Sequence, residues 1–201
     1  MDTTRVEWTN NLENYFKELG EQSLCLSMLH KRAEAYFSIK AQRIDLPVIV
    51  FSTICGSLSL SAKSLFGAEN EQFAMTGVGI LSLFTGILGT IQAYYSYSRR
   101  AESHRNSYLE YSKLYRFVKI ELGLPRIQRI VAKDLLKIVN DMFERLNEIS
   151  NLIPEGIVND FKKKHKKNKT ITRPEIANGL HPISIFVEGN INYEEEKEET
   201  V

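Results

Sequence analysis

The chain contains few of the residues on which cross-linked or catalytic proteins depend. It has only two cysteines, Cys25 and Cys55, and Cys55 lies within an apolar segment, so neither a disulfide framework nor a cysteine metal site is expected. Its four histidines are scattered, and no pair has the spacing of metal ligands on one helix face. The sequence also lacks a G-x-x-x-x-G-K-[ST] phosphate-binding loop. These absences argue against an enzyme, and no metal or cofactor is predicted.

An excess of charge of either sign is also missing. The 26 basic and 25 acidic residues give a net charge of +1, so no nucleic-acid partner is expected. A mean hydropathy of -0.25 is typical of soluble proteins, but this average conceals a division into blocks. Charged residues are almost absent between residues 46 and 98 and dense on either side.

Two long apolar segments fill the region that is poor in charge. They run from residue 46 to 66 and from 73 to 97, and the only formal charge inside either is Lys63. A bilayer core of about 30 Å requires about 20 apolar residues in a helix, and both segments reach that length. Lys63 lies near the outer end of the first segment, where its amine can reach the interface. The sequence therefore predicts a transmembrane hairpin.

The alternative is a pair of buried helices in a soluble protein, and the density of glycine and serine disfavours it. Each glycine costs a helix in water about 1 kcal/mol, whereas small residues allow membrane helices to approach closely. Small residues recur every four positions in both segments. The predicted helix-packing residues are Ser52, Gly56, Ser82, Gly86 and Thr90.

Basic residues flank the hairpin on one side only. The connector at 67–72 has two glutamates and no basic residue. By the positive-inside rule, both termini face the cytosol and the connector faces the opposite side. Tyrosines near residue 95 lie where an aromatic belt is expected, and without a signal peptide the first span would direct insertion. The flanking basic residues are Lys31, Arg32, Lys40 and Arg43 before the hairpin, and Arg99, Arg100, Arg105, Lys113 and Arg116 after it.

Amphipathic helical patterns occupy the sequence on both sides of the hairpin. Residues 4–45 carry an apolar stripe at spacings of three and four, with a potential bend at Gly20 and a junction at Pro47. The second span has no stop signal, so it is predicted to continue as one helix to Gly123. A further amphipathic helix is predicted at 126–151.

The predicted fold is therefore all-α, with a two-helix transmembrane hairpin continuous with a cytosolic helical bundle and an irregular C-terminal tail. Residues 4–45 form the N-terminal helical region and 46–97 the hairpin. Residues 98–153 complete the bundle, and 154–201 form a tail that is basic, then acidic and partly disordered.

The basic run FKKKHKKNK at 161–169 has several interpretations. It can be a solvated tail, or it can bind anionic headgroups, because each lysine near a membrane contributes about 1 kcal/mol. Nucleic acid is disfavoured, because no aromatic residues alternate with the lysines. The predicted membrane-binding residues are Lys162, Lys163, Lys164, Lys166 and Lys167. The later segment HPISIFVEG at 181–189 is a candidate strand or an extended strip that docks a protein partner.

Three stretches of the sequence resemble a known family. They are SMLHKRAEAYFSIKAQ, DLPVIVFSTICGSLS and RRAESHRNSYLEYSKLYRFVKIEL. With them the chain is similar, over about residues 8–190, to the SLATT proteins, the SMODS-and-SLOG-associating two-transmembrane effectors. It is most similar to stand-alone members of large DNA viruses. The residues that carry the resemblance are His30, Pro47, Gly56, His104, Tyr111, Leu114 and Tyr115.

The resemblance implies a cytosolic helical bundle on a two-span hairpin, in a family whose members are proposed to oligomerise and open pores. The chain lacks the nucleotidyltransferase or nucleotide sensor often fused to this domain, which puts ligand-gated activation in doubt. We therefore expect a homo-oligomeric membrane protein that perturbs the bilayer or forms a pore. The alternative is a non-catalytic structural membrane protein, for example a viral inner-membrane component, that docks partners through its bundle and tail. The absence of an intramembrane acid or arginine counts against a selective channel.

Overall fold

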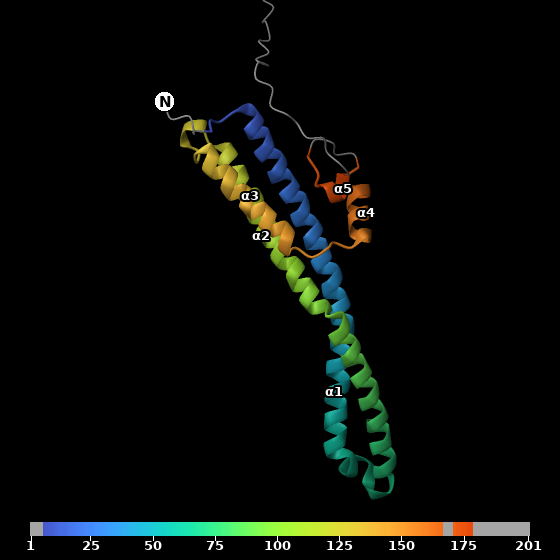
Figure 1. The fold of residues 1–201 in the computed structure, drawn as a ribbon. Helices are drawn as coiled ribbons and strands as arrows, with labels where there is room; N and C mark the ends of the chain where they lie inside the picture. Colours follow the sequence, from blue (N-terminus) through green and yellow to red (C-terminus); the bar gives the residue numbers. More distant parts are fainter. Residues whose placement is uncertain (1–5, 167–170, 179–201) are drawn as a thin grey trace, which may run out of the picture.

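The computed structural model describes residues 6–166 and 171–178, and every regular element in these residues is a helix. Helix α1 (Asn10–Tyr95) reverses direction within its length, so that its second arm and α2 (Tyr97–Gly123) return beside its first arm (Figure 1). A short 3-10 turn (Arg126–Gln128) leads to α3 (Ala132–Ile149). Helices α4 (Glu155–Lys164) and α5 (Glu175–Asn178) follow. The predicted all-α class and helical hairpin are confirmed.

The hairpin turn depends on Gly67. This residue has a φ of 75° and a ψ of 166°, a conformation that glycine adopts readily and other residues avoid. The returning arm is helical again from Glu69. The turn is therefore tighter than the predicted connector at 67–72, which had placed the start of the second helix at residue 73.

The first arm of α1 begins at Asn10 and continues through both positions at which a bend or junction was predicted. Thr9 caps the helix, because its hydroxyl accepts a hydrogen bond from the Leu12 N–H at 3.2 Å. Pro47 lies inside the helix without interrupting it. Gly20 is also helical, and a Cβ placed there would lie 3.1 Å from Val118 Cγ1. Glycine at position 20 therefore permits close packing of α1 against α2, and it does not bend the helix.

The predicted continuous helix from the second span to Gly123 is interrupted at one residue. Ser96 adopts the left-handed conformation, with φ 47° and ψ 44°, and separates the returning arm of α1 from α2. Its N–H still donates to the Gln92 carbonyl at 2.9 Å, and its hydroxyl donates to the Ala93 carbonyl at 2.7 Å. These bonds let the chain change direction while keeping the local carbonyls paired. The predicted end of the helix at Gly123 is confirmed.

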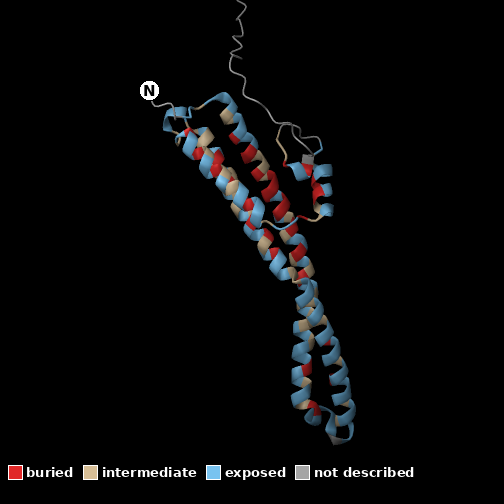
Figure 2. Cartoon of the chain, viewed as in Figure 1, coloured by how far each residue is buried: buried red, intermediate tan, exposed pale blue. Residues whose placement is uncertain are grey.

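Helix α3 packs on α1 and α2 and closes a hydrophobic core. The predicted helix at 126–151 is shortened to Ala132–Ile149, because residues 126–131 form the reversal between α2 and α3. The indole of Trp8 donates to the Ile130 carbonyl at 3.2 Å and joins this reversal to the start of α1. Figure 2 shows buried residues concentrated along the bundle. The core consists of Phe16, Leu19, Leu26, Tyr111, Leu114, Val118, Leu135, Val139 and Leu146.

The first part of the predicted irregular tail is instead folded against α1. Phe161 and Val158 of α4 and Ala177 of α5 are buried in a second apolar cluster with Cys25 and Leu29 of α1. The backbone N–H of Thr172 donates to the Glu21 carboxylate at 2.7 Å and fixes the segment beside the same face. Residues 154–166 and 171–178 therefore belong to the bundle. The predicted docking strip at 181–189 and the acidic end of the chain lie outside the described residues.

Candidate functional site

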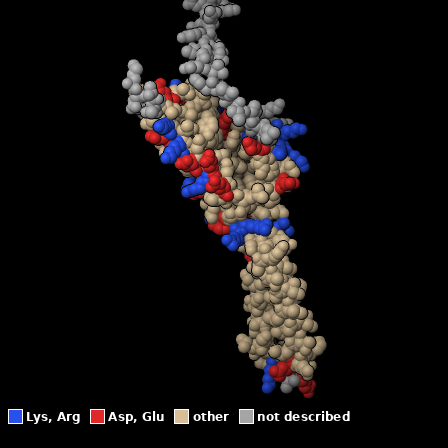
Figure 3. Space-filling model, in the orientation of Figure 1, with Lys and Arg blue, Asp and Glu red and all other residues tan. Residues whose placement is uncertain are grey.

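The apolar hairpin is the largest feature that the bundle leaves uncovered. The helical stretches that contain its two arms, Asn10–Gly67 and Glu69–Gly123, are long and apolar enough to cross a membrane, with mean hydropathies of 1.6 and 1.7 in their most apolar windows. Only 6% of each window is buried. A core helix of a soluble protein would be mostly buried. The space-filling view shows a shaft with few charged side chains along its length (Figure 3). Apolar surface on this scale is characteristic of a membrane or protein contact.

Small side chains bring the two arms of the hairpin together. Cys55 and Ala62 of the first arm and Val78 and Thr85 of the second are the buried residues of this segment. Phe51 and Phe84 add an edge-to-face contact, with ring centroids 6.0 Å apart. The contact is narrow, so most of the surface of both arms faces outward.

The structure places the five predicted helix-packing residues outside this contact. Ser52, Gly56, Ser82, Gly86 and Thr90 are all exposed. A Cβ added at Gly56 or Gly86 would meet no atom within 4 Å. These residues therefore do not form the contact between the two arms of one chain. Packing against another molecule in a membrane remains a prediction.

The threonine hydroxyls in the hairpin are satisfied within their own helices. Thr53 donates to the Ile49 carbonyl at 2.8 Å, and Thr85 donates to the Leu81 carbonyl at 2.7 Å. Such hydroxyls are compatible with hydrocarbon, because they leave no polar hydrogen without a partner. Thr85 therefore requires neither a polar lumen nor a partner on the opposite arm.

A polar clamp crosses the hairpin where it meets the bundle. One carboxylate oxygen of Asp45 accepts a hydrogen bond from Gln92 Nε2 at 2.9 Å, and the other accepts from Ser98 Oγ at 2.9 Å. These donors lie on either side of Ser96. Asp45 therefore fastens both sides of the left-handed turn to the first arm. A cavity of about 310 Å³ adjoins the clamp.

Aromatic and basic side chains surround the clamp. The Lys40 Nζ lies 4.4 Å from the Tyr36 ring centroid and 5.5 Å from that of Tyr97. A hydrogen bond with Tyr36 is the main cause that raises the pKa of Lys40. Tyr95 stacks on Tyr97 with centroids 5.2 Å apart. Figure 3 shows a basic band between the bundle and the apolar shaft. Tyrosine and lysine are the residue types found at membrane interfaces.

A buried histidine pair joins α1 to α2 higher in the bundle. The Nδ1 atoms of His30 and His104 are 2.9 Å apart. The imidazole of His104 stacks on Phe37, and that of His30 stacks on Tyr111. Burial lowers the pKa of His30 to about 4, with a further contribution from His104, and burial also lowers the pKa of His104. The pair is therefore neutral near pH 7.

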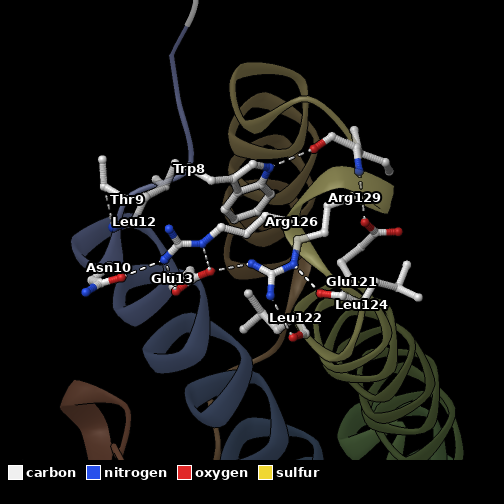
Figure 4. Close-up of polar contacts among 11 residues, drawn as sticks. Trp8, Thr9, Asn10, Leu12, Glu13, Glu121, Leu122, Leu124, Arg126 and Arg129 are labelled. Carbon is white, nitrogen blue, oxygen red and sulfur yellow. Dashed lines mark hydrogen bonds and ion pairs between the residues drawn. The ribbon is translucent and has the colours of Figure 1, made fainter.

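An ion-pair cluster closes the end of the bundle that lies away from the hairpin (Figure 4). Glu13 accepts hydrogen bonds from Arg126, at 2.9 Å, and from Arg129. These bonds lower the pKa of Glu13 to about 2. Arg129 also donates to the Leu124 carbonyl at 2.7 Å and lies 5.0 Å from the Trp8 ring centroid. The cluster fixes the start of α1 against the α2–α3 reversal.

The predicted membrane-binding lysines lie far from the hairpin. Lys162, Lys163, Lys164 and Lys166 are exposed at the end of α4 and just after it, while Lys167 lies outside the described residues. The neighbouring Phe161 ring lies under Arg32 of α1 at 5.5 Å. Arg32 precedes Leu46 by 14 residues, which is about 21 Å of helix. Headgroup binding by these lysines stays a prediction, and their distance from the first span does not favour it.

Three groupings escaped the sequence reasoning, namely the Asp45 clamp, the histidine pair and the Glu13 cluster. Each grouping joins residues that are far apart in the chain. Only Asp45 could have been noticed in the sequence, because it lies beside an apolar segment. Within residues 6–166 and 171–178, no group of three or more His, Cys, Asp or Glu side chains could hold a metal ion. Comparison of the chain with protein-family models, curated proteins and solved structures finds no match. The SLATT resemblance stays a prediction.

Proposed function

We propose that the chain is a membrane effector of the SLATT type, anchored by its hairpin and acting by self-association that perturbs the bilayer. The observation that carries the proposal is the exposure of the hairpin, because 94% of the most apolar window of each arm is not buried within the chain. In water this surface would drive aggregation, whereas in a bilayer it is matched to lipid and to neighbouring helices.

The proposed orientation places the bundle and both termini in the cytosol. Four basic residues, Lys40, Arg43, Arg99 and Arg100, border the apolar shaft at the bundle end. The far turn carries Glu69 and Glu71 on the second arm and Lys63 on the first. This asymmetry supports a cytosolic bundle by the positive-inside rule. Labelling of a cysteine introduced at Asn70 from outside the compartment tests the orientation, and labelling from the cytosolic side would contradict it.

Self-association is supported by the uncovered small residues. Ser82, Gly86 and Thr90 recur every four positions on the returning arm and are exposed. Ser52 and Gly56 are exposed on the first arm. Small residues at this spacing allow close approach of helices in a membrane, where van der Waals packing drives association. A second copy of the chain is the proposed partner.

Dye release from liposomes tests the proposed activity. Purified full-length protein is reconstituted at rising protein-to-lipid ratios, and oligomers are detected by cross-linking. Leakage should rise steeply with protein density and should fall in Gly86→Leu, because a large side chain there separates the helices. Gly77→Leu is the matched control, because a Cβ at Gly77 also meets no atom within 4 Å but position 77 lies outside the four-residue series. Intact oligomers without leakage at high density would contradict the pore proposal.

A structural membrane protein is the second proposed function, and the composition of the hairpin favours it. Lys63 is the only charged residue in the two apolar segments, and Thr53, Thr85 and Thr90 bond their own helices. Nothing in this arrangement requires an aqueous path. A partner captured by the full chain and lost on deletion of residues 161–201, with insertion unchanged and no leakage, would support this function over the effector.

A further inference from the structure

The cavity beside the Asp45 clamp is lined by both apolar and polar residues. Its volume is about 310 Å³, and it lies between the two arms where the hairpin meets the bundle. The apolar lining residues are Ile44, Gly89 and Ala93, and the polar or charged ones are Asp45, Gln92, Ser96, Tyr97, Ser98 and Arg99.

Basic residues outnumber acidic residues at this level of the molecule. The hydrogen bond from Ser98 to Asp45 sets the register of the arms. Arg43 precedes Asp45 by two residues and Arg100 follows Ser98 by two, so in antiparallel helices they lie at about the same height. Lys40 reaches this level through its contact with the Tyr97 ring. We call Lys40, Arg43, Arg99 and Arg100 the basic collar.

The acidic groups near the collar are already engaged. Both oxygens of Asp45 accept hydrogen bonds from the neutral groups of Gln92 and Ser98. Glu102, the next acidic residue along α2, lies 3.8 Å from Arg105. Figure 3 shows the resulting basic band next to the apolar shaft. The charge of the collar therefore exceeds that of Asp45 and remains available to an anion.

We propose that the cavity and the basic collar bind the headgroup of an anionic phospholipid. The guanidinium of Arg99 binds the phosphate, because planar guanidinium groups form paired hydrogen bonds to phosphate oxygens. The glycerol and the start of an acyl chain lie along Gly89 and Ala93. The remaining collar residues attract the negative headgroup. A free phosphate ion would make no use of the apolar lining residues, so a lipid is the source that fits the site.

The inference rests on the proposed insertion of the hairpin, because only then does the collar lie at the headgroup level. It assigns lipid binding to the junction between the hairpin and the bundle, whereas the sequence predicted it for the lysines of α4. Each basic residue close to an anionic surface increases binding about fivefold, so removal of two should decrease it about 30-fold at low salt.

The test measures which lipid the full-length protein retains. Delipidated protein in detergent is incubated with equal amounts of phosphatidylglycerol and phosphatidylcholine, and bound lipid is counted by native mass spectrometry. Wild-type protein should retain phosphatidylglycerol in preference to phosphatidylcholine. This preference should be at least tenfold smaller in R99Q/R100Q. K113Q/R116Q is the matched control, because it removes two charges from α2 about 20 Å further along the helix. Circular dichroism at 222 nm checks that both variants are folded.

Two further measurements need no variant. The wild-type preference should weaken between 50 and 500 mM salt, because salt screens surface charges. Inorganic phosphate at the same ionic strength as sodium chloride should displace no more lipid than the chloride does, and specific displacement by phosphate would overturn the lipid assignment. Equal retention of the two lipids by the wild type, or equal losses in both double variants, would also overturn it. A preference for phosphatidylglycerol without dye release would support lipid binding by the collar and contradict only the pore proposal.

Discussion

His30 and His104 form a buried hydrogen bond between α1 and α2, with their Nδ1 atoms 2.9 Å apart and exposed fractions of only 2% and 1%. One Nδ1 must carry the proton and the other must accept, so two neutral rings at these positions have opposite tautomers. A second proton would place a positive charge in a site lined by the rings of Phe37 and Tyr111. The bond is therefore a pH-sensitive connection between the helices that lead to the two arms of the apolar hairpin.

Acidification should destabilise the bundle through this pair. The pKa of His30 falls from about 6.5 when unfolded to about 4 when folded, so the unfolded chain binds a proton more readily between these values. Stability is then lost as the pH falls from 6.5 towards 4, by about 3 kcal/mol at most. The measurement is the urea midpoint of detergent-solubilised protein, followed by Trp8 fluorescence at several pH values.

A variant identifies the histidine pair as the source of this pH dependence. His30→Phe should cost about 1–3 kcal/mol at pH 7, because it leaves His104 buried without its partner. It should also flatten the loss of stability between pH 6.5 and 4. An unchanged pH profile in His30→Phe would assign the acid sensitivity to other groups.

The Asp45 clamp should hold the turn at Ser96 closed. Asp45→Ala removes the acceptor of both Gln92 and Ser98, and each lost bond is worth about 1 kcal/mol. Amide hydrogen exchange of residues 93–100 should therefore accelerate about tenfold or more. Asp160→Ala, an exposed position on α4, is the matched control. Equal protection of residues 93–100 in wild type and Asp45→Ala would show that the clamp does not stabilise the turn.

Ser96→Gly provides an independent test of the same turn. A side chain in the left-handed conformation costs roughly 1–2 kcal/mol, and glycine avoids this cost. Ser96→Gly should therefore retain the protection of its neighbours or raise it, despite the loss of the Ser96 hydroxyl bond. Ser96→Val should lower it, because a β-branched residue is disfavoured at positive φ.

The Glu13 cluster should stabilise the closed end of the bundle over a wide pH range. Glu13→Gln removes the charge that binds Arg126 and Arg129 and should cost about 1–2 kcal/mol at pH 7. The pKa of Glu13 is about 2 when folded, so its contribution is present above pH 4.5 and is lost as the pH falls towards 2. The urea midpoint followed by Trp8 fluorescence measures the effect. Glu18→Gln, exposed on the same helix, should have little effect.

Local periodicity predicted most of the helical fold, because it repeats within each segment. The apolar runs at 46–66 and 73–97 and the end at Gly123 needed no information from elsewhere in the chain. Periodicity could not reveal the register of one helix against another. The His30–His104 bond spans 74 positions and the Gln92–Asp45 bond spans 47. The same limit explains why the sequence did not show which helix the small residues of the hairpin face.

The segment at 154–178 shows a second reason for failure. Its composition, with a run of lysines, is typical of a solvated tail, and only a few of its apolar side chains contact the bundle. Phe161 and Val158 are buried against α1, while the adjacent lysines stay exposed on the outer face of α4. A short amphipathic helix of this kind is stabilised by its tertiary contacts, which the sequence does not reveal.

Docking of this segment should control the reactivity of Cys25. The Cys25 thiol is 6% exposed and contacts the Thr172 carbonyl at 3.9 Å, and burial raises its pKa to about 11. Phe161→Ala removes a buried aromatic ring from the contact, a change that typically costs 3–5 kcal/mol and should release the segment. In a Cys55→Ala background, maleimide labelling of Cys25 at pH 7.5 should then accelerate at least tenfold. The acceleration follows because exposure and the return of the thiol pKa towards 9 both favour reaction.

Ile176→Ala, partly exposed on α5, is the control and should leave the rate close to that of the parent. Equal rates in the Phe161→Ala variant and its parent would show that Cys25 is shielded by the α1–α2 bundle alone.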